Sequence, residues 1–259
     1  MLNRVGWVTS LCALGLLLAA CGEAGSAGGD AAPADGTAEF KAAADALAAR
    51  LAGNGPVPAA SDPVVQAFET QTARALDTLG TPALPLRGFQ SYDDLCAKTA
   101  TVVGAYVNAG TAQAPAEGQL EIQNRNAELY IDQLFTPLLF SAHCSAAHLP
   151  FLESTLSPSE LQEKAAAVQQ VRSGALGQFA GLLQMAGADD LDAARRARIV
   201  RLLAADAAEF AIIFTPQQRQ ELGQMAERVR AAVPEGSREE AARIGPALNQ
   251  AACGRLCSH

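Results

Sequence analysis

The side chains with the greatest catalytic potential are the histidines and their neighbours. His143 and Cys144 are adjacent, Ser141 lies two residues before His143, and His148 lies five residues after it. Residues one or two apart on a helix do not face each other, so Ser141 and His143 are not predicted to form a nucleophile–base pair. The sequence contains no G-x-S-x-G, G-x-G-x-x-G or phosphate-binding loop motif. It therefore assigns no catalytic residue and no cofactor.

Four cysteines in the body of the chain are candidates for disulfides. They are Cys96, Cys144, Cys253 and Cys257. An even set in an exported protein is typical of two disulfides, and three pairings are possible. We favour Cys96–Cys144 with Cys253–Cys257, because the last two lie close together in a short tail. The same tail spells C-x3-C-x-H with His259, a possible zinc site, but an oxidising compartment favours the disulfide, so no metal is assigned.

Arg172 and Asp206 lie within the apolar stripes of two neighbouring predicted helices, near 158–187 and 190–214. A tight turn between these helices predicts an antiparallel hairpin, and the register of the apolar stripes places Arg172 opposite Asp206. The sequence therefore predicts a partly buried ion pair that fixes the register of the hairpin. The alternative is that Asp206 is a functional carboxylate in a cleft.

An active site built from residues far apart in the sequence is a further alternative. Its first candidates are Asp206, Arg172, Asn124 and His143. Such a site requires a concave pocket in which these polar groups converge.

The elements that must position these residues are predicted to be helices. From Ala38 onward the apolar residues recur with a period of 3.6, and no run alternates with a period of two. Short connections favour an all-α, multi-helix bundle with mostly antiparallel neighbours, spanning 38–259. We expect Leu120 on an inward face and an interruption at Pro246. The predicted helix starts are Asp62-Pro63, Ser91–Asp94, Ser157–Glu160, Asp189 or Asp190, Thr215–Gln218 and Ser237–Glu240.

The amino terminus carries an export signal. Arg4 precedes an apolar run of 16 residues, Val5 to Ala20, which is shorter than the roughly 20 residues of a membrane span. The run ends in Leu18-Ala19-Ala20-Cys21, which resembles the lipobox of bacterial lipoprotein precursors. The alternative is an ordinary signal peptide followed by a chance cysteine.

The resemblance to lipoprotein precursors has three consequences. It implies removal of residues 1–20, attachment of diacylglyceryl to Cys21, and acylation of its amine by a chain such as palmitate. Glycine at position 22 implies the outer membrane, with the domain facing the periplasm or, alternatively, the cell surface. The segment 21–37 is predicted to be a flexible tether, whose Gly22–Gly36 stretch spans about 20 Å.

The composition restricts the class of partner. The chain has 259 residues, 49% of them hydrophobic, with 19 Lys and Arg against 27 Asp and Glu. Loss of residues 1–20, which hold only Arg4, leaves 18 − 27 = −9 charges. Nucleic acids and anionic lipid surfaces select basic patches, so both are disfavoured as ligands of the domain, and a protein with a basic surface is favoured.

A five-residue segment resembles a second family. Phe214-Thr215-Pro216-Gln217-Gln218 is similar to the Leu-Thr-x-x-Gln motif of periplasmic helical stress chaperones, with Phe in place of Leu. The same residues also form a helix amino-terminal capping box, which is the favoured interpretation.

Three functions remain open at the level of sequence. The favoured hypothesis is a lipid-anchored interaction protein, in its most specific form an immunity protein that inhibits an envelope-acting toxin. A periplasmic chaperone or lipid carrier is the second hypothesis. An envelope enzyme with an unrecognised helical active site is the third.

Overall fold

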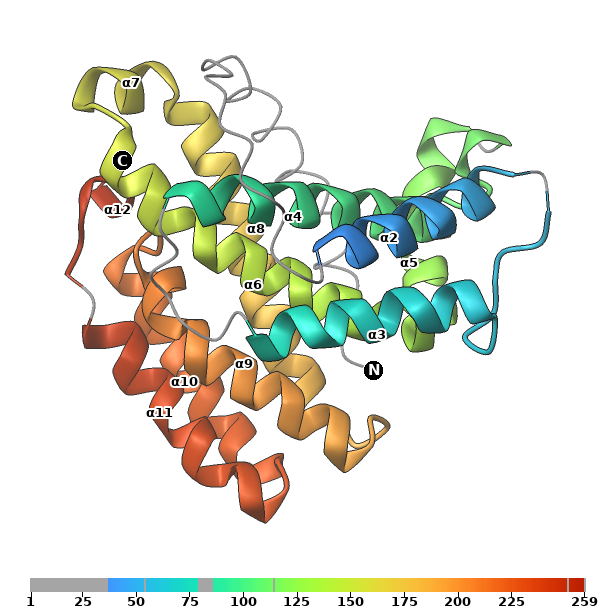
Figure 1. Cartoon of the computed structure of the whole chain (residues 1–259). Helices are drawn as coiled ribbons and strands as arrows, with labels where there is room; N and C mark the ends of the chain where they lie inside the picture. Colours follow the sequence, from blue (N-terminus) through green and yellow to red (C-terminus); the bar gives the residue numbers. More distant parts are fainter. Residues whose placement is uncertain (1–36, 54, 79–85, 114, 251, 259) are drawn as a thin grey trace. The chain divides into compact units, whose positions relative to one another are not determined.

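The structure, a computed structural model, describes residues 37–53, 55–78, 86–113, 115–250 and 252–258. Every regular element in these ranges is a helix, which confirms the predicted all-α, multi-helix class (Figure 1). The predicted signal peptide, Cys21 and the tether up to residue 36 lie outside the described residues. None of the described helices is long and apolar enough to cross a membrane.

The described helices form two compact units, and the boundary lies between Ser141 and Ala142, inside one helix. We call these the N-terminal unit and the C-terminal unit, and each is described by itself. The helices that begin in the N-terminal unit are α2 (Thr37–Ala52), α3 (Pro63–Thr78), α4 (Leu86–Val107), the short 3-10 helix η2 (Thr111–Gln113), α5 (Ala116–Leu129) and α6 (Ile131–Thr155).

The core of the N-terminal unit is built around three phenylalanine rings. The ring of Phe40 on α2 lies 5.6 Å from that of Phe68 on α3 and 5.5 Å from that of Phe140 on α6. All three side chains are fully buried. The core therefore combines the consecutive helices α2 and α3 with the distant α6, and the stripes that contain Phe40 and Phe68 face inward as predicted.

Two predicted helix starts in this unit have different outcomes. The Asp62 side chain accepts a hydrogen bond from the Val64 backbone N–H at 3.0 Å and α3 begins at Pro63, which confirms this start. The start at Ser91 is wrong, because α4 already begins at Leu86. Helix α4 therefore begins five residues before the predicted start.

The C-terminal unit contains the end of α6 and all later helices. These are α7 (Pro158–Glu163), α8 (Ala165–Ala186), α9 (Ala193–Ala211), α10 (Pro216–Ala232), the 3-10 helix η3 (Glu235–Ser237), α11 (Arg238–Gln250) and α12 (Arg255–Ser258). The capping boxes at Ser157 and Thr215 are present with both of their hydrogen bonds. Asp192, rather than Asp189 or Asp190, caps α9.

Helices α10 and α11 lie side by side in the C-terminal unit (Figure 1). A Cβ added at Gly223 on α10 would lie 3.7 Å from the Cα of Gly245 on α11, so the two backbones approach closely where neither residue has a side chain. Helix α11 continues through Pro246, so the predicted interruption is wrong. Ile244 and Leu248, two residues before and after the proline, are fully buried, and their burial stabilises the helix although the proline removes a backbone hydrogen bond.

The hairpin of α8 and α9 forms with a different register from the predicted one. The Phe179 ring lies 5.2 Å from that of Phe210, whereas the sequence placed Ile199 opposite Phe179. The difference of 11 residues corresponds to about three helical turns. Helix α9 starts at Ala193, so the connection is 187–192, two residues longer than the predicted turn, and this accounts for only a small part of the difference.

Candidate functional site

A stripe of three glutamates runs along the exposed side of α5 in the N-terminal unit. Glu117, Glu121 and Glu128 follow the spacing i, i+4, i+11 and are all exposed. At about 100° per residue, this spacing places the three side chains within about 40° of one another around the helix. We call this stripe the α5 ridge.

Polar contacts hold α5 against the end of α4 and thereby orient the ridge. The buried Asn126 amide donates to the carbonyl oxygens of Val107 at 3.0 Å and Ala109 at 2.8 Å. The Gln123 side chain donates to the Asn108 side chain at 2.8 Å. Asn126 lies on the side of α5 opposite the ridge, so these bonds turn the glutamates toward solvent.

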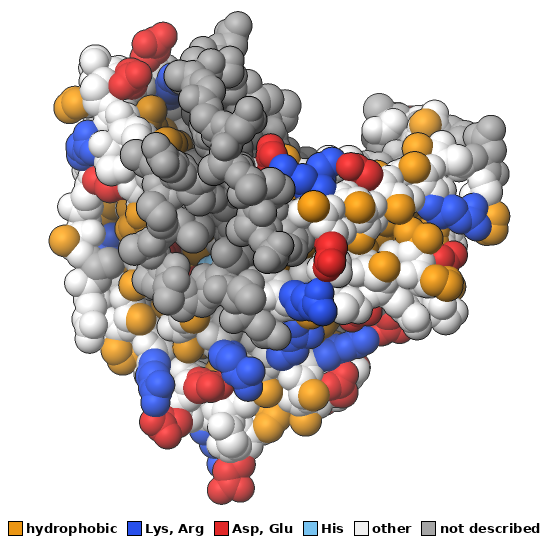
Figure 2. All heavy atoms as spheres, viewed as in Figure 1, with side chains coloured by type: hydrophobic (Ala, Val, Ile, Leu, Met, Phe, Trp, Pro, Cys, Tyr) orange, Lys and Arg blue, Asp and Glu red, His pale blue; other side chains and the backbone are white. Residues whose placement is uncertain are grey.

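None of the three ridge glutamates forms an ion pair or a side-chain hydrogen bond within the described part of the chain. On α10 and α11, by contrast, exposed glutamates pair with arginines, at 3.3 Å for Glu227–Arg230 and 2.5 Å for Glu239–Arg243. Figure 2 shows side chains of both signs side by side over that part of the surface. The helix dipole favours Glu117 in the first turn of α5, but like charges four residues apart destabilise a helix by a few tenths of a kcal/mol, so stability does not account for adding Glu121 to the ridge.

Two leucines flank the ridge. Leu120 is 44% exposed and Leu129 is 63% exposed, and they are the large hydrophobic residues left exposed among the described residues. Leu120 was predicted to face inward, and this prediction is wrong. It shares a face with the buried Ala127, but burial of this face does not extend to the amino-terminal end of α5.

A second polar cluster lies in the C-terminal unit. His143 on α6 contacts Asp206 on α9, with Nδ1 at 3.0 Å from Oδ1 and 2.8 Å from Oδ2. The two side chains are 15% and 7% exposed. The structure thus unites two of the four residues proposed as an enzymatic site, and Asp206 orients the imidazole.

Glu209, one turn after Asp206, adds a second carboxylate to this cluster. Burial raises the pKa of Glu209, and the neighbouring Asp206 charge adds to the shift, while His143 opposes it. The Oε2 atom of Glu209 is buried and has no hydrogen-bond partner among the described residues. No group of three or more His, Cys, Asp or Glu in the described part of the chain has a geometry that would hold a metal ion.

The predicted ion pair between Arg172 and Asp206 does not form. The Arg172 Nε donates to the Ile213 carbonyl oxygen at 2.8 Å, and its Nη2 donates to the carbonyl oxygens of Leu256 and Cys257. The shifted hairpin register is the physical reason, because it brings the end of α9 to Arg172 and leaves Asp206 for His143. Burial lowers the pKa of Arg172, which is 5% exposed.

The other residues singled out from the sequence, His148, Thr215 and Asn124, take no part in the contact between His143 and Asp206. The buried His148 contacts the carbonyl oxygen of Cys144 through Nδ1 at 2.5 Å. The Thr215 hydroxyl accepts from the Gln218 backbone N–H at 3.3 Å, which agrees with capping as the role of the chaperone-like motif. Asn124 lies in the N-terminal unit, and its buried Oδ1 has no hydrogen-bond partner among the described residues.

All four cysteines of the domain are disulfide-bonded. Cys253 and Cys257 are joined to each other, as the spacing favoured, and this excludes their thiolates from a zinc site. Cys96 and Cys144 are both buried, and their pairing with each other stays a prediction. His259 lies outside the described residues.

Sequence reasoning missed the α5 ridge. The signal was the i, i+4, i+11 spacing of glutamates in a helix with few apolar residues, and the sequence predictions did not use it. Comparisons of the chain with protein-family models, curated proteins and solved structures found no match.

Proposed function

We propose that this chain is a lipid-anchored protein of the bacterial envelope that acts by binding another protein, and that the α5 ridge docks on a basic surface of that partner. The observation that carries the proposal is the combination on one helix of unpaired glutamates and exposed leucines. Exposed apolar side chains rimmed by charge are typical of docking sites.

The charges of the ridge fit a cationic partner. Arg125 is the single basic residue of α5, against Glu117, Glu121 and Glu128. Glu117 and Glu121 repel each other in the free protein. A row of Lys or Arg side chains on the partner would relieve this repulsion in the complex. Complementary charge also accelerates capture of a partner, and the acceleration falls as salt rises.

Leu120 and Leu129 would supply the apolar part of the contact. They lie about 180° apart around the helix, one on each side of the ridge, so a partner must grip both sides of α5 to cover them and would then exclude water from the glutamates between them. Exclusion of water strengthens charge pairing and the burial of leucine together.

The anchor supports the same function. The lipobox at Cys21 and the tether that follows would hold the domain within about 20 Å of the membrane, where it would intercept a protein that acts in the envelope. An immunity protein that inhibits an envelope-acting toxin is the specific form that we propose. A toxin that acts on acidic envelope polymers or membranes would carry the basic surface that the ridge requires.

The experiment compares two charge-reversal variants of the exported chain in partner capture from envelope extract, with quantitative mass spectrometry. The test variant is Glu121→Lys/Glu128→Lys. The control variant is Glu163→Lys/Glu235→Lys, which changes the net charge equally at two exposed glutamates outside α5. We expect the test variant to lose a stoichiometric basic protein that the wild type and the control retain.

The other outcomes of the capture experiment distinguish between the hypotheses. Equal loss in both variants would indicate attraction by net charge and would refute a docking site on α5. Retention in both would place the contact elsewhere. Capture of many unfolded proteins that is insensitive to the ridge would favour the chaperone hypothesis.

The contact between His143 and Asp206 favours an enzyme as the second candidate function. A carboxylate on Nδ1 orients an imidazole and fixes its tautomer, as general-base catalysis requires. If this function holds, Asp206→Asn abolishes turnover of an envelope substrate while the fold is retained. Full activity of Asp206→Asn would reject it.

A further inference from the structure

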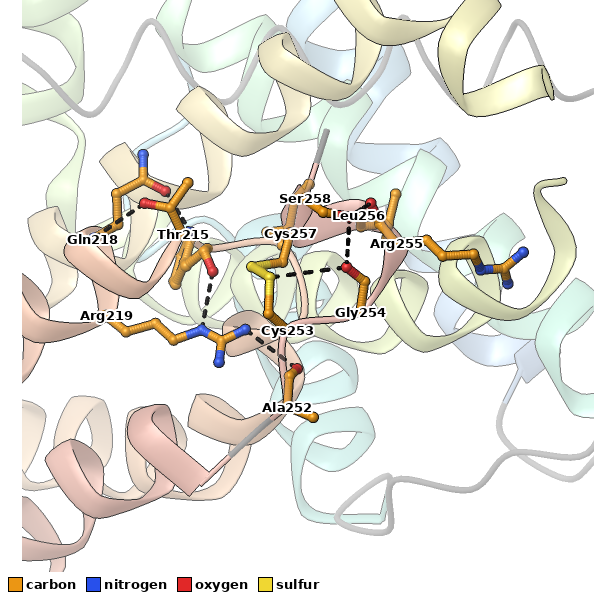
Figure 3. The surroundings of a disulfide bond; sticks show 12 residues. Thr215, Gln218, Arg219, Ala252, Cys253, Gly254, Arg255, Leu256, Cys257 and Ser258 are labelled. Carbon is orange, nitrogen blue, oxygen red and sulfur yellow. Dashed lines mark hydrogen bonds between the residues drawn. A yellow bond between two sulfur atoms is a disulfide. The ribbon is translucent and has the colours of Figure 1, made fainter. Parts of the chain in front are cut away.

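The carboxy-terminal segment 252–258 is fastened to three helices of the C-terminal unit by polar contacts. Arg219 on α10 donates to the carbonyl oxygen of Ala252 at 3.4 Å. Glu153 on α6 accepts from the backbone N–H groups of this segment, and Arg172 on α8 donates to its carbonyl groups. Figure 3 shows Arg219 reaching the segment beside the disulfide.

Both ends of the single helical turn α12 are used in this attachment. At its amino-terminal end, the Glu153 carboxylate accepts from the N–H groups of Arg255 at 2.7 Å and Leu256 at 2.8 Å. At its carboxy-terminal end, the Arg172 guanidinium donates to the carbonyl oxygens of Leu256 and Cys257. A carboxylate at the amino-terminal end and a cation at the carboxy-terminal end are the charges that the dipole of a helix favours.

The geometry of these contacts depends on the helical conformation of α12. The N–H groups that point to Glu153 and the carbonyl groups that point to Arg172 are parallel because the turn is wound. A single turn of four residues is not stable by itself in water, since nucleation of a helix fixes several residues for one hydrogen bond. Something other than α12 must therefore keep it wound.

The disulfide links Cys253, two residues before α12, to Cys257, the third residue of α12, and so closes a five-residue ring that contains most of the turn. The two residues are four apart, which is the spacing of one helical turn. Cys257 is buried and Cys253 is exposed, so an attacking thiol reaches the bond from the side of Cys253. The sulfur that solvent can reach, on Cys253, and the buried residue whose carbonyl oxygen binds Arg172, Cys257, thus belong to the same five-residue ring.

Arg172 makes the attachment sensitive to the state of α12. Its guanidinium is buried, and its acceptors among the described residues are three carbonyl oxygens, of which that of Ile213 lies outside the tail. If α12 unwinds, the cation keeps one of its three acceptors in a site that excludes water. A buried cation in this condition is strongly unfavourable, so the tail must leave and admit water to Arg172.

We propose that segment 252–258 is a redox latch: reduction of the Cys253–Cys257 disulfide by a dithiol unwinds α12 and releases the tail from Glu153 and Arg172. A thiolate of the dithiol attacks the Cys253 sulfur, the S–S bond breaks, and Cys257 leaves as a thiolate that takes up a proton. The second thiolate of the dithiol then displaces Cys253, which is also protonated. The dithiol becomes a cyclic disulfide, and the protein disulfide becomes two thiols.

Hydrogen–deuterium exchange of the exported chain tests the latch. In a Cys96→Ser/Cys144→Ser background the single disulfide of the described domain is the one in the tail, and dithiothreitol is the reductant. We expect the amides of Arg255 and Leu256 to exchange roughly 30-fold faster after reduction, which is the loop-closure effect of a five-residue ring. The amides of α10 should not change, and alkylation with mass spectrometry should verify the two free thiols.

A second measurement keeps the test independent of the serine background. The wild-type chain is compared with Cys253→Ser/Cys257→Ser, with the other cysteines intact. The amides of Arg255 and Leu256 should again exchange faster in the variant. Unchanged exchange in both experiments would show that Glu153 and Arg172 hold α12 without the disulfide, and would overturn the latch.

Discussion

Replacement of Arg172 by methionine tests how the C-terminal unit accommodates a buried cation. Arg172→Met keeps most of the apolar stem but removes the donors to the carbonyl oxygens of Ile213, Leu256 and Cys257. Loss of a hydrogen bond to a buried acceptor costs about 1 kcal/mol, so three such losses cost roughly 3 kcal/mol. Removal of a poorly solvated charge offsets roughly 1 kcal/mol of this.

The expected net loss is therefore about 2 kcal/mol in the free energy of unfolding. For a chain of this length it corresponds to a fall in Tm of about 4 to 8 °C. Urea unfolding of the exported chain, followed by far-UV circular dichroism, measures it. The optical probe matters, because the single tryptophan, Trp7, belongs to the predicted signal peptide.

Two controls make the result interpretable. Arg243→Met removes an exposed guanidinium that pairs with Glu239, and it should cost less than about 0.5 kcal/mol. A double-mutant cycle of Arg172→Met with Asp206→Asn should be additive, because these residues do not contact each other. An effect of Arg172→Met as small as that of Arg243→Met, or a coupling above about 1 kcal/mol in the cycle, would refute the reasoning.

Four further predictions follow from single contacts. A Cβ in Gly254→Ala would overlap the Glu153 carboxylate and push it from the start of α12, so urea unfolding should show a loss of about 1 to 3 kcal/mol, and an unchanged midpoint would contradict this contact. Thr215→Ala removes a capping side chain and should lower the free energy of unfolding by about 1 kcal/mol by the same assay. Burial raises the pKa of Glu209 in the folded state above its ordinary value of 4.5, so the folded protein holds this proton more tightly than the unfolded chain, and stability falls as pH rises through the interval between the two values. Glu209→Gln should flatten this fall and be more stable than the wild type above that interval, and parallel pH profiles of the two proteins would reject the argument. Burial raises the pKa of Tyr106 to about 12, so one of the three tyrosines should ionise late in an ultraviolet pH titration, and the late step should vanish in Tyr106→Phe.

The sequence correctly predicted those features whose physical cause lies within a few residues along the chain. Asp62, Ser157 and Thr215 cap helices because each side chain reaches a backbone N–H two or three residues away, which depends on nothing else in the fold. The disulfide between Cys253 and Cys257 follows from the same kind of proximity. The start of α4 at Leu86 was missed because a Pro- and Gly-rich segment weakens the local helical pattern.

The amino-acid sequence by itself determined the helical class, the capping residues, the disulfide of the tail and the acidity of the domain, because periodicity, spacing and charge are read directly along the chain. Only the tertiary structure decided that Asp206 meets His143, that Arg172 holds the carboxy-terminal turn, and that Leu120 is exposed. These features depend on how far one helix is shifted along its neighbour and on where neighbouring helices end. A shift of one helix along another leaves every apolar stripe buried while it exchanges all the polar partners, so hydrophobic patterning fixes which face is inside and leaves the partners undetermined.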